Sequence, residues 1–227
     1  MAALLECEVR FPQKQASAFT TKKRLPVLVV SCDEREETWT LPLRVAKVLD
    51  SQLGSDEFCP ASRAELAHKV KSLSQTLGKT RLAELIDKRD YSAQEALKKL
   101  VADGYSREVS QGLVDRAQEC GLIDDVRFAK SFIRFKLSCG WGAKKISYEL
   151  ARRGVDVKEV PGWPQEFFED ESEFELAYKA ASKKRITGKN DYQKIVRFLG
   201  SRGFSFGIAS SVARQILNEF DNASDGQ

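Results

Sequence analysis

A short pattern of leucine, glycine and an apolar residue occurs three times in the chain and constrains its fold more than any other feature. In residues 100–105, 150–155 and 199–204, a leucine stands four residues before a glycine, which Tyr, Val or Phe follows. A residue that commonly caps helices comes next: Ser106, Asp156 or Ser205. The three glycines are 50 and 49 residues apart. A fixed period of this length indicates a repeated supersecondary unit.

Each copy of the pattern is typical of a helix that ends at a left-handed glycine and is followed by a new helix. Glycine is favoured just past a helix end because that position requires a positive φ, and the apolar residue after it closes the cap. We therefore expect units of a helix, a capped helix, the glycine and a further helix. One unit buries little apolar area, whereas three in tandem can stack into an elongated array.

The first part of the chain has a different period. Residues 4–11, 24–31 and 37–41 read as short strands, and Pro26 predicts that the second strand begins there or lies at a sheet edge. The polar residues 32–37 favour a hairpin link, and residues 43–53 favour a short helix that ends near Gly54. The sequence thus predicts a mainly α protein, preceded by a small strand-containing N-terminal extension.

Helical periodicity begins at Ser62 and continues to the C-terminal region. Ser62 with Glu65, and Ser92 with Glu95, have the spacing of capping boxes, and Gly78 is expected to end the first of these helices. The expected organisation is an extension at 1–61, a first repeat with a leading helix at 62–121, a second repeat at 122–169, a third at 170–220 and a disordered tail at 221–227.

Positive charge concentrates in the second and third repeats. Residues 124–220 hold 18 Lys and Arg against 13 Asp and Glu, and six of these acids crowd into residues 166–175. A surface of this kind favours a polyanion or an acidic protein face. For any single cation a solvated surface position is favoured, but for the clusters together we expect binding. The candidate partner- or DNA-binding residues are Lys144, Lys145, Arg152, Arg153, Lys183, Lys184, Arg185, Lys194, Arg197 and Arg202.

Two features near these cations have alternative interpretations. Lys145, Glu149, Arg152 and Arg153 share one helix face at i, i+4, i+7 and i+8, so Lys145 and Arg152 project together beside Glu149. Trp141 and Tyr148 could stack on bases or dock a partner, although core packing is the favoured interpretation for both.

No catalytic constellation occurs, so we expect a protein that is not an enzyme and uses no cofactor. His68 is the only histidine, and neither GxxxxGK[ST] nor GxGxxG is present. The five cysteines are scattered without CxxC spacing, which predicts reduced thiols and no zinc site. The chain has neither a recognisable signal peptide nor an apolar run long enough to span a membrane, so we expect a cytoplasmic protein.

Residues 121–156, GLIDDVRFAKSFIRFKLSCGWGAKKISYELARRGVD, closely resemble the central repeat of the RecX regulatory proteins. The resemblance includes the element Asp125-x-x-Phe128-Ala129 and the glycine before a basic helix. Residues 195–216 are similar to that family's C-terminal repeat, with Arg202–Phe204 as its Arg-Gly-Phe signature, and residues 88–100 to the start of its first repeat. The resemblance covers about residues 79–220. The N-terminal extension and the long acidic link after Pro161 depart from the family pattern.

The resemblance implies a curved array of three-helix repeats that lodges in the groove of a filament of RecA recombinase on single-stranded DNA. It also implies that the protein curbs the filament's extension, ATPase and strand exchange, and so modulates DNA repair, recombination and the SOS response. The expected partners are this filament and single- or double-stranded DNA, and a monomer is expected. Two alternatives stay open: a stand-alone DNA-binding protein with trihelical basic modules, and a helical adaptor for unrelated proteins.

Overall fold

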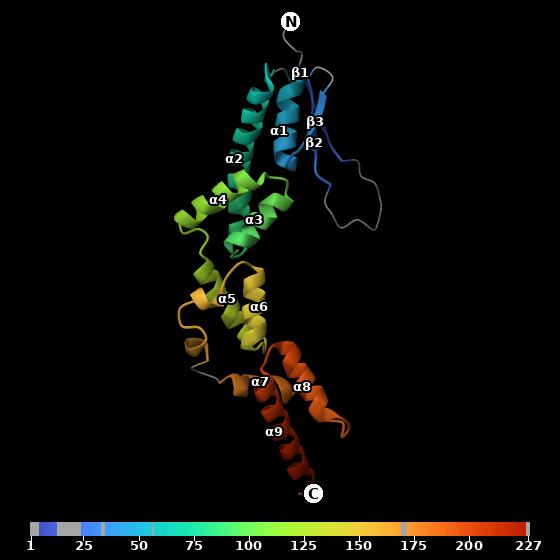
Figure 1. Ribbon diagram of the computed structural model, residues 1–227, viewed down its shortest axis with the longest axis vertical. Helices are drawn as coiled ribbons and strands as arrows, with labels where there is room; N and C mark the ends of the chain where they lie inside the picture. Colours follow the sequence, from blue (N-terminus) through green and yellow to red (C-terminus); the bar gives the residue numbers. More distant parts are fainter. Residues whose placement is uncertain (1–4, 13–23, 33–34, 56, 169–171, 226–227) are drawn as a thin grey trace. The chain divides into compact units, whose positions relative to one another are not determined.

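The computed structural model describes residues 5–12, 24–32, 35–55, 57–168 and 172–225 (Figure 1). The chain divides into two compact units, Met1–Ile123 and Asp124–Gln227. The described part of the first unit contains a small sheet and four helices, and that of the second unit is helical. The predicted class, mainly α with strands near the N-terminus, is confirmed.

The sheet of the first unit is antiparallel, in the order β1 (Leu5–Arg10), β2 (Val27–Cys32) and β3 (Arg35–Thr40). The strand pattern was predicted, but the hairpin link is shorter than expected, because residues 35–37 belong to β3; residues 33–34 lie outside the described part. Side chains of one face, among them Val9, Leu28 and Val30, enter the core. This alternation follows from the two-residue period of a strand.

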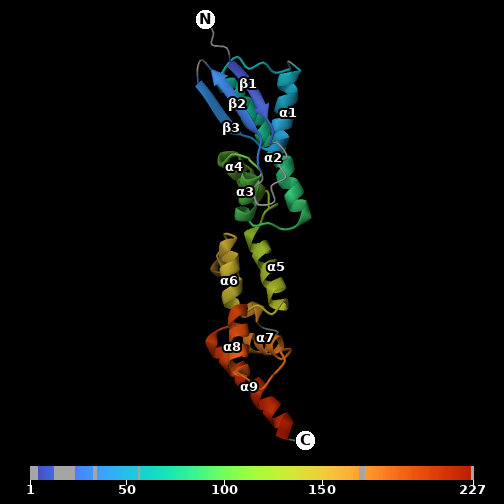
Figure 2. The ribbon, with the colours of Figure 1, turned by 90° about the vertical axis from the view of Figure 1, so that its right-hand side faces the viewer.

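Two helices pack against the sheet and against each other (Figures 1 and 2). Helix α1 (Leu43–Gly54) contacts β1 and buries Val45, Ala46 and Leu49. Helix α2 (Arg63–Lys88) begins at Ser62, whose hydroxyl accepts a hydrogen bond from the Glu65 N–H at 3.2 Å. The Glu65 carboxylate accepts from the Ala61 N–H at 2.8 Å.

The prediction that Gly78 ends a helix is wrong, because α2 runs through it for 26 residues. A Cβ at this position would lie 2.6 Å from Leu113 Cδ1 and 3.2 Å from Tyr105 Cε1. Glycine here accommodates the close approach of other side chains and does not make a turn. Helices α3 (Ala93–Ala102) and α4 (Arg107–Glu119) complete the unit and form a helical hairpin.

A single hydrophobic cluster runs through the first unit, from Val9 and Leu28 on the sheet to Leu66 on α2, Leu100 on α3 and Ile123. The expected boundary between an extension at 1–61 and a repeat at 62–121 therefore does not separate two cores. The apolar face of the sheet packs against the helices of the first repeat. Each part covers apolar surface that the other would leave in contact with water.

The second unit contains α5 (Asp125–Ser138), α6 (Ala143–Arg152), α7 (Glu173–Ala181), α8 (Asp191–Arg202) and α9 (Phe206–Asp225). One cluster lies around Ile133, Ile146 and Leu150, and another around Leu199 and Val212. Leu176 packs against both clusters.

Two expectations about this unit are wrong. After Gly154 the expected helix is only the 3₁₀ turn η1 (Val157–Glu159), since Pro161 and Pro164 follow, lack an N–H and disfavour the helical conformation in the residue before them. A second 3₁₀ turn, η2 (Gln165–Phe167), follows. In addition, α9 continues to Asp225 through most of the expected tail, and residues 226–227 lie outside the described part.

The three glycines of the repeated pattern all have positive φ, +101° at Gly104, +80° at Gly154 and +91° at Gly203, as predicted. In each copy the N–H of the apolar residue donates to the carbonyl of the leucine, as Tyr105 does to Leu100 at 3.2 Å. This is the Schellman motif, in which the second residue past the helix folds back onto the last turn. The repeated pattern is therefore the sequence of one helix-ending motif.

Candidate nucleic-acid and protein interface

Helix α6 presents two different faces. Ile146 and Leu150 are fully buried in the second cluster. A second row of side chains, which we call the α6 stripe, follows the helix at intervals of four, three and four residues. It consists of Trp141, Lys145, Tyr148 and Arg152. The spacing places Lys145, Tyr148 and Arg152 on one side of α6, and Trp141, which precedes the helix, lies beside Lys145, so aromatic rings and cations alternate along the row.

Each ring of the α6 stripe lies near a cation. Lys145 Nζ is 4.4 Å from the Trp141 ring centroid, and Lys136 Nζ on α5 is 4.5 Å from it. The guanidinium of Arg152 is 6.0 Å from the Tyr148 ring. These distances fall within the range of cation–π attraction. Tyr148 is 64% exposed, against the expectation of core packing, whereas Trp141 packs partly against the second cluster.

The charge of Glu149, the one acid within α6, is balanced by neighbouring arginines. Glu149 accepts hydrogen bonds from Arg153 at 2.6 Å and from Arg152 at 3.1 Å. The hydrogen bond from Arg153 lowers the pKa of this carboxyl, burial opposes the change, and the charges of both arginines add to the lowering. Glu149 is therefore ionised at neutral pH, and its charge is balanced within α6.

The start of α6 rests on the end of α8 through main-chain atoms. The Gly142 N–H donates to the Arg202 carbonyl at 2.9 Å, and Lys145 Nζ donates to the Ser201 carbonyl at 3.0 Å. A Cβ on Gly142 would lie 2.7 Å from the Gly203 carbonyl carbon and oxygen. We call this contact the glycine joint. It holds the cations of the second repeat next to those of the third.

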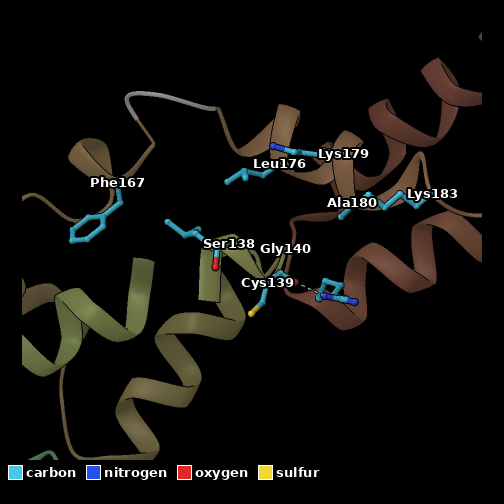
Figure 3. Close-up of a pocket in the computed structure, with 10 residues that line it drawn as sticks. Ser138, Cys139, Gly140, Phe167, Leu176, Lys179, Ala180 and Lys183 are labelled. Atoms are coloured by element: carbon cyan, nitrogen blue, oxygen red, sulfur yellow. Dashed lines mark hydrogen bonds between the residues drawn. The ribbon is translucent and has the colours of Figure 1, made fainter. Parts of the chain in front are cut away.

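A pocket of about 370 Å³ lies next to the glycine joint (Figure 3). Its lining combines the end of α5 at Ser138–Gly140 with α7. Lys179, Lys183 and Arg202 supply positive charge, and Arg202 donates to the Cys139 carbonyl at 2.6 Å. Phe167 and Leu176 supply apolar surface. The pocket is therefore cationic and partly apolar.

The structure sorts the ten candidate cations into groups. Lys145 and Arg152 belong to the α6 stripe, while Lys183 and Arg202 line the pocket. Lys184 Nζ lies 4.3 Å from the Phe198 ring. Three further candidates are exposed on α6, after α7 and on α8: Lys144, Arg185 and Arg197.

Two candidates make contacts inside their own repeat. Arg153 is half-buried, donates to Glu149 and lies 4.8 Å from the Phe132 ring. Lys194 donates to Asp191 Oδ1 at 3.0 Å and to Thr187 Oγ1 at 2.6 Å.

Sequence reasoning missed Lys136, although a signal for it was present. Gly140 ends α5 with a φ of +71°, and the Trp141 N–H donates to the Lys136 carbonyl at 3.0 Å. The motif that ends the repeat helices therefore also ends α5, and it folds Trp141 back onto Lys136. Lys136 lies near three rings, with Phe132 and Phe135 at 5.4 and 4.9 Å besides Trp141.

The carboxylate of Asp191 organises the loop before α8. It is 7% exposed and accepts hydrogen bonds from the Thr187 N–H at 2.8 Å, the Thr187 hydroxyl at 2.9 Å and Lys194 at 3.0 Å. Burial by itself raises the pKa of this carboxyl, but the hydrogen bonds from Lys194 and Thr187 outweigh burial and lower the pKa to about 2.

Replacing Asp191 with Asn is expected to destabilise the third repeat at neutral pH. Because the folded pKa of about 2 lies below the ordinary value of 3.8, this carboxylate stabilises the fold above about pH 4. Its contribution is lost as the pH falls from 3.8 through 2, so the difference in melting temperature between wild type and variant should shrink in that range. Thermal unfolding from pH 7 to pH 2 measures this. Asp87→Asn on exposed α2 is the control, and a constant gap for Asp191→Asn would contradict the expectation.

Among the residues that the structure describes, no group of three or more His, Cys, Asp or Glu side chains could hold a metal ion. Within the same described ranges, no helix has the length and apolar character that crossing a bilayer demands.

Tandem helical units, joined through glycines and carrying a face of cations and aromatic rings, define the chain as a helical-repeat protein. Models of the second and third three-helix domains of RecX match residues 124–159 and 170–212. The regulatory protein RecX of Chromohalobacter salexigens is 39% identical over 133 residues, which are 54% of this chain and 81% of the relative. That of Legionella pneumophila is 31% identical over 142 residues, 60% of this chain and 92% of the relative. The chain belongs to the RecX family of regulatory proteins.

Solved structures share the fold. The crystal structure of RecX from Lactobacillus salivarius has a TM-score of 0.53 at 19% identity and covers 63% of this chain and 96% of its own. A crystal structure of a regulatory protein RecX has a TM-score of 0.55 at 18% identity and covers 95% and 99%. The second comparison extends over the N-terminal strands as well as the repeats, so the strand-containing extension does not set the chain outside this fold.

Proposed function

We propose that the protein binds the filament of RecA recombinase on single-stranded DNA and inhibits its ATPase, its extension and strand exchange. In this role it modulates DNA repair, recombination and the SOS response in the cytoplasm, acting as a monomer without catalysis of its own. Family membership supports the regulatory role, because the relatives are named regulatory proteins. The observation that carries the proposal is the cationic face that the glycine joint assembles from the second and third repeats.

The physical chemistry of this face suits a filament. Phosphates and acidic side chains attract cations on the α6 stripe and in the neighbouring pocket, and this attraction weakens as salt screens it. The contact between repeats is made by backbone atoms at Gly142, Arg202 and Lys144, so the cations are held on a defined frame. A frame of this kind lowers the entropy lost when an extended partner binds.

The test is the ATPase activity of purified RecA on single-stranded DNA, with and without the full-length protein. The expected result is a concentration-dependent loss of ATP hydrolysis and of strand exchange, which is weaker at high salt. Unchanged ATP hydrolysis at saturating protein would overturn the proposal.

A second candidate is a DNA-binding protein that acts alone. The exposed Tyr148 and Arg152 on α6, the second helix of a three-helix unit, favour it, since such helices commonly present side chains to DNA. This alternative expects tight binding to free duplex DNA with a steep dependence on salt. Weak binding that salt does not change would exclude it.

A further inference from the structure

We propose that the α6 stripe is a base-stacking platform for single-stranded nucleic acid. This inference rests on the proposed function and deepens it, because it assigns one surface of the protein to the nucleic-acid strand of the filament. Bases stack on the Tyr148 and Trp141 rings, and Lys145 and Arg152 bind the adjacent phosphates.

The first argument is the exposure of the rings. Tyr148 is 64% exposed, and Phe135, at the end of α5, is 60% exposed. The two rings are therefore accessible to a ligand, and a cation lies beside each of them, Arg152 beside Tyr148 and Lys136 beside Phe135. Lys136 lies near Phe135 and Trp141 together, so it connects the α5 ring with the stripe.

The second argument is the alternation of rings and cations. Proteins that bind single strands combine a cationic track for the backbone with aromatic side chains on which successive bases stack. An acidic protein partner needs only the cations and does not account for the exposed Tyr148 ring between Lys145 and Arg152. Glu149 does not oppose a phosphate here, because Arg152 and Arg153 balance its charge.

The third argument favours a single strand over a duplex. The faces of bases in a duplex are covered by their neighbours, whereas an unpaired strand can turn its bases onto an aromatic side chain. Tyr148 lies within α6 and Trp141 just before its start, and each ring has its own neighbouring cation, Arg152 and Lys145 respectively. The two rings are therefore separate positions and take separate bases.

The experiment measures binding of the full-length protein to three labelled probes by fluorescence anisotropy. The probes are an oligothymidylate, a strand of equal length with abasic sites in place of thymidines, and a duplex of equal length. The abasic strand keeps every phosphate and removes the stacking partners. The expected order of affinity is oligothymidylate first, and the abasic strand and duplex weaker.

Tyr148→Ala is expected to weaken oligothymidylate binding about 5- to 150-fold, the range for loss of one stacked base. Tyr148→Phe keeps the ring and should stay within about threefold of wild type. Phe206→Ala removes a ring that is 72% exposed on α9 of the same unit and is the matched control, with unchanged binding expected. Because Tyr148 is exposed, its replacement is not expected to disturb folding, and circular dichroism of each variant checks this.

Several outcomes would overturn the platform. They are equal affinity for the abasic strand and oligothymidylate, a preference for duplex, and unchanged binding by Tyr148→Ala. If Tyr148→Ala abolishes inhibition of the recombinase ATPase while oligothymidylate binding is unchanged, the stripe docks protein and the stacking proposal falls while the proposed function stands. If the variants behave as expected with free strands but the wild type leaves the ATPase unchanged, the proposed function falls and the platform stands.

Discussion

Gly142→Val is expected to destabilise the second unit by about 3 kcal/mol or more, because it inserts a branched side chain into the glycine joint. A Cβ at Gly142 would lie 2.7 Å from three main-chain atoms, the Gly203 carbonyl carbon and oxygen and the Phe204 nitrogen. Backbone atoms cannot turn away as a flexible side chain can. The φ of Gly142 is −86°, which any residue can adopt. The expected loss of stability therefore comes from the steric clash with the main chain of Gly203 and Phe204, and not from backbone strain.

Hydrogen exchange measured along the chain is the readout, since it separates the two units. Protection should fall in residues 124–225 and stay unchanged in residues 35–120. Gly112→Val is the matched control: Gly112 lies inside α4 with no atom within 4 Å of its would-be Cβ, so valine there should change stability by less than about 0.5 kcal/mol. Equal protection in wild type and Gly142→Val would show that the repeats do not depend on the glycine joint.

Reversing two charges on the α6 stripe, Lys145→Glu with Arg152→Glu, is expected to weaken inhibition of the recombinase ATPase at least about tenfold. The change removes two cations and places three carboxylates in a row with Glu149, which repel phosphate and acidic side chains. Titration of ATP hydrolysis against protein concentration measures the effect. Circular dichroism at the same concentrations verifies that the helices remain.

The control for charge reversal is Lys47→Glu with Lys99→Glu, two exposed cations on α1 and α3. Both double variants take the formal net charge from +4 to zero, so a difference between them comes from position. We expect the control pair to inhibit as wild type does. Equal inhibition by both pairs and wild type would exclude the α6 stripe from the interface, and equal loss in both would point to net charge alone.

The parts of the fold that the sequence predicts depend on local interactions. The Schellman motif at Gly104, Gly154 and Gly203 needs only six consecutive residues, so its pattern is legible in the chain. The serine caps at Ser62 and Ser92 are equally local, and each accepts the expected N–H. These signals predicted the helical repeats.

The parts that sequence reasoning missed depend on distant residues. Gly78 resembles a helix end, yet it serves the approach of Leu113, 35 residues further on. Gly142 resembles a simple break between helices, and it is one, but it also contacts Gly203 in the next repeat. No local sequence pattern contains this information, because a glycine in the sequence does not show whether it serves a positive φ or the close packing of a distant residue.

The candidate site was likewise predicted only in part. The clusters of cations were predicted from charge density and helical spacing, but the expected burial of Tyr148 was wrong because Ile146 and Leu150 already fill the inner face of α6. Lys136 was missed for a local reason: the helix-ending motif at Gly140 was not recognised, so the fold-back of Trp141 onto Lys136 was not predicted. A helical wheel assigns residues to the faces of one helix. It does not show which residues a chain reversal at the end of that helix brings beside it.

The glycine joint has a consequence for how this surface can change. The contact between the second and third repeats is made by main-chain atoms of Gly142, Arg202 and Gly203, which every amino-acid sequence with those two glycines would offer. The glycine joint does not include Tyr148 or Arg152, so these two residues can be exchanged for others without moving the frame, whereas Lys145 donates to the Ser201 carbonyl and Trp141 packs partly against the second cluster. For protein engineering, geometry and recognition are therefore separable in part: the two glycines, Trp141 and Lys145 are held constant, and Tyr148 and Arg152 are varied toward a different ligand.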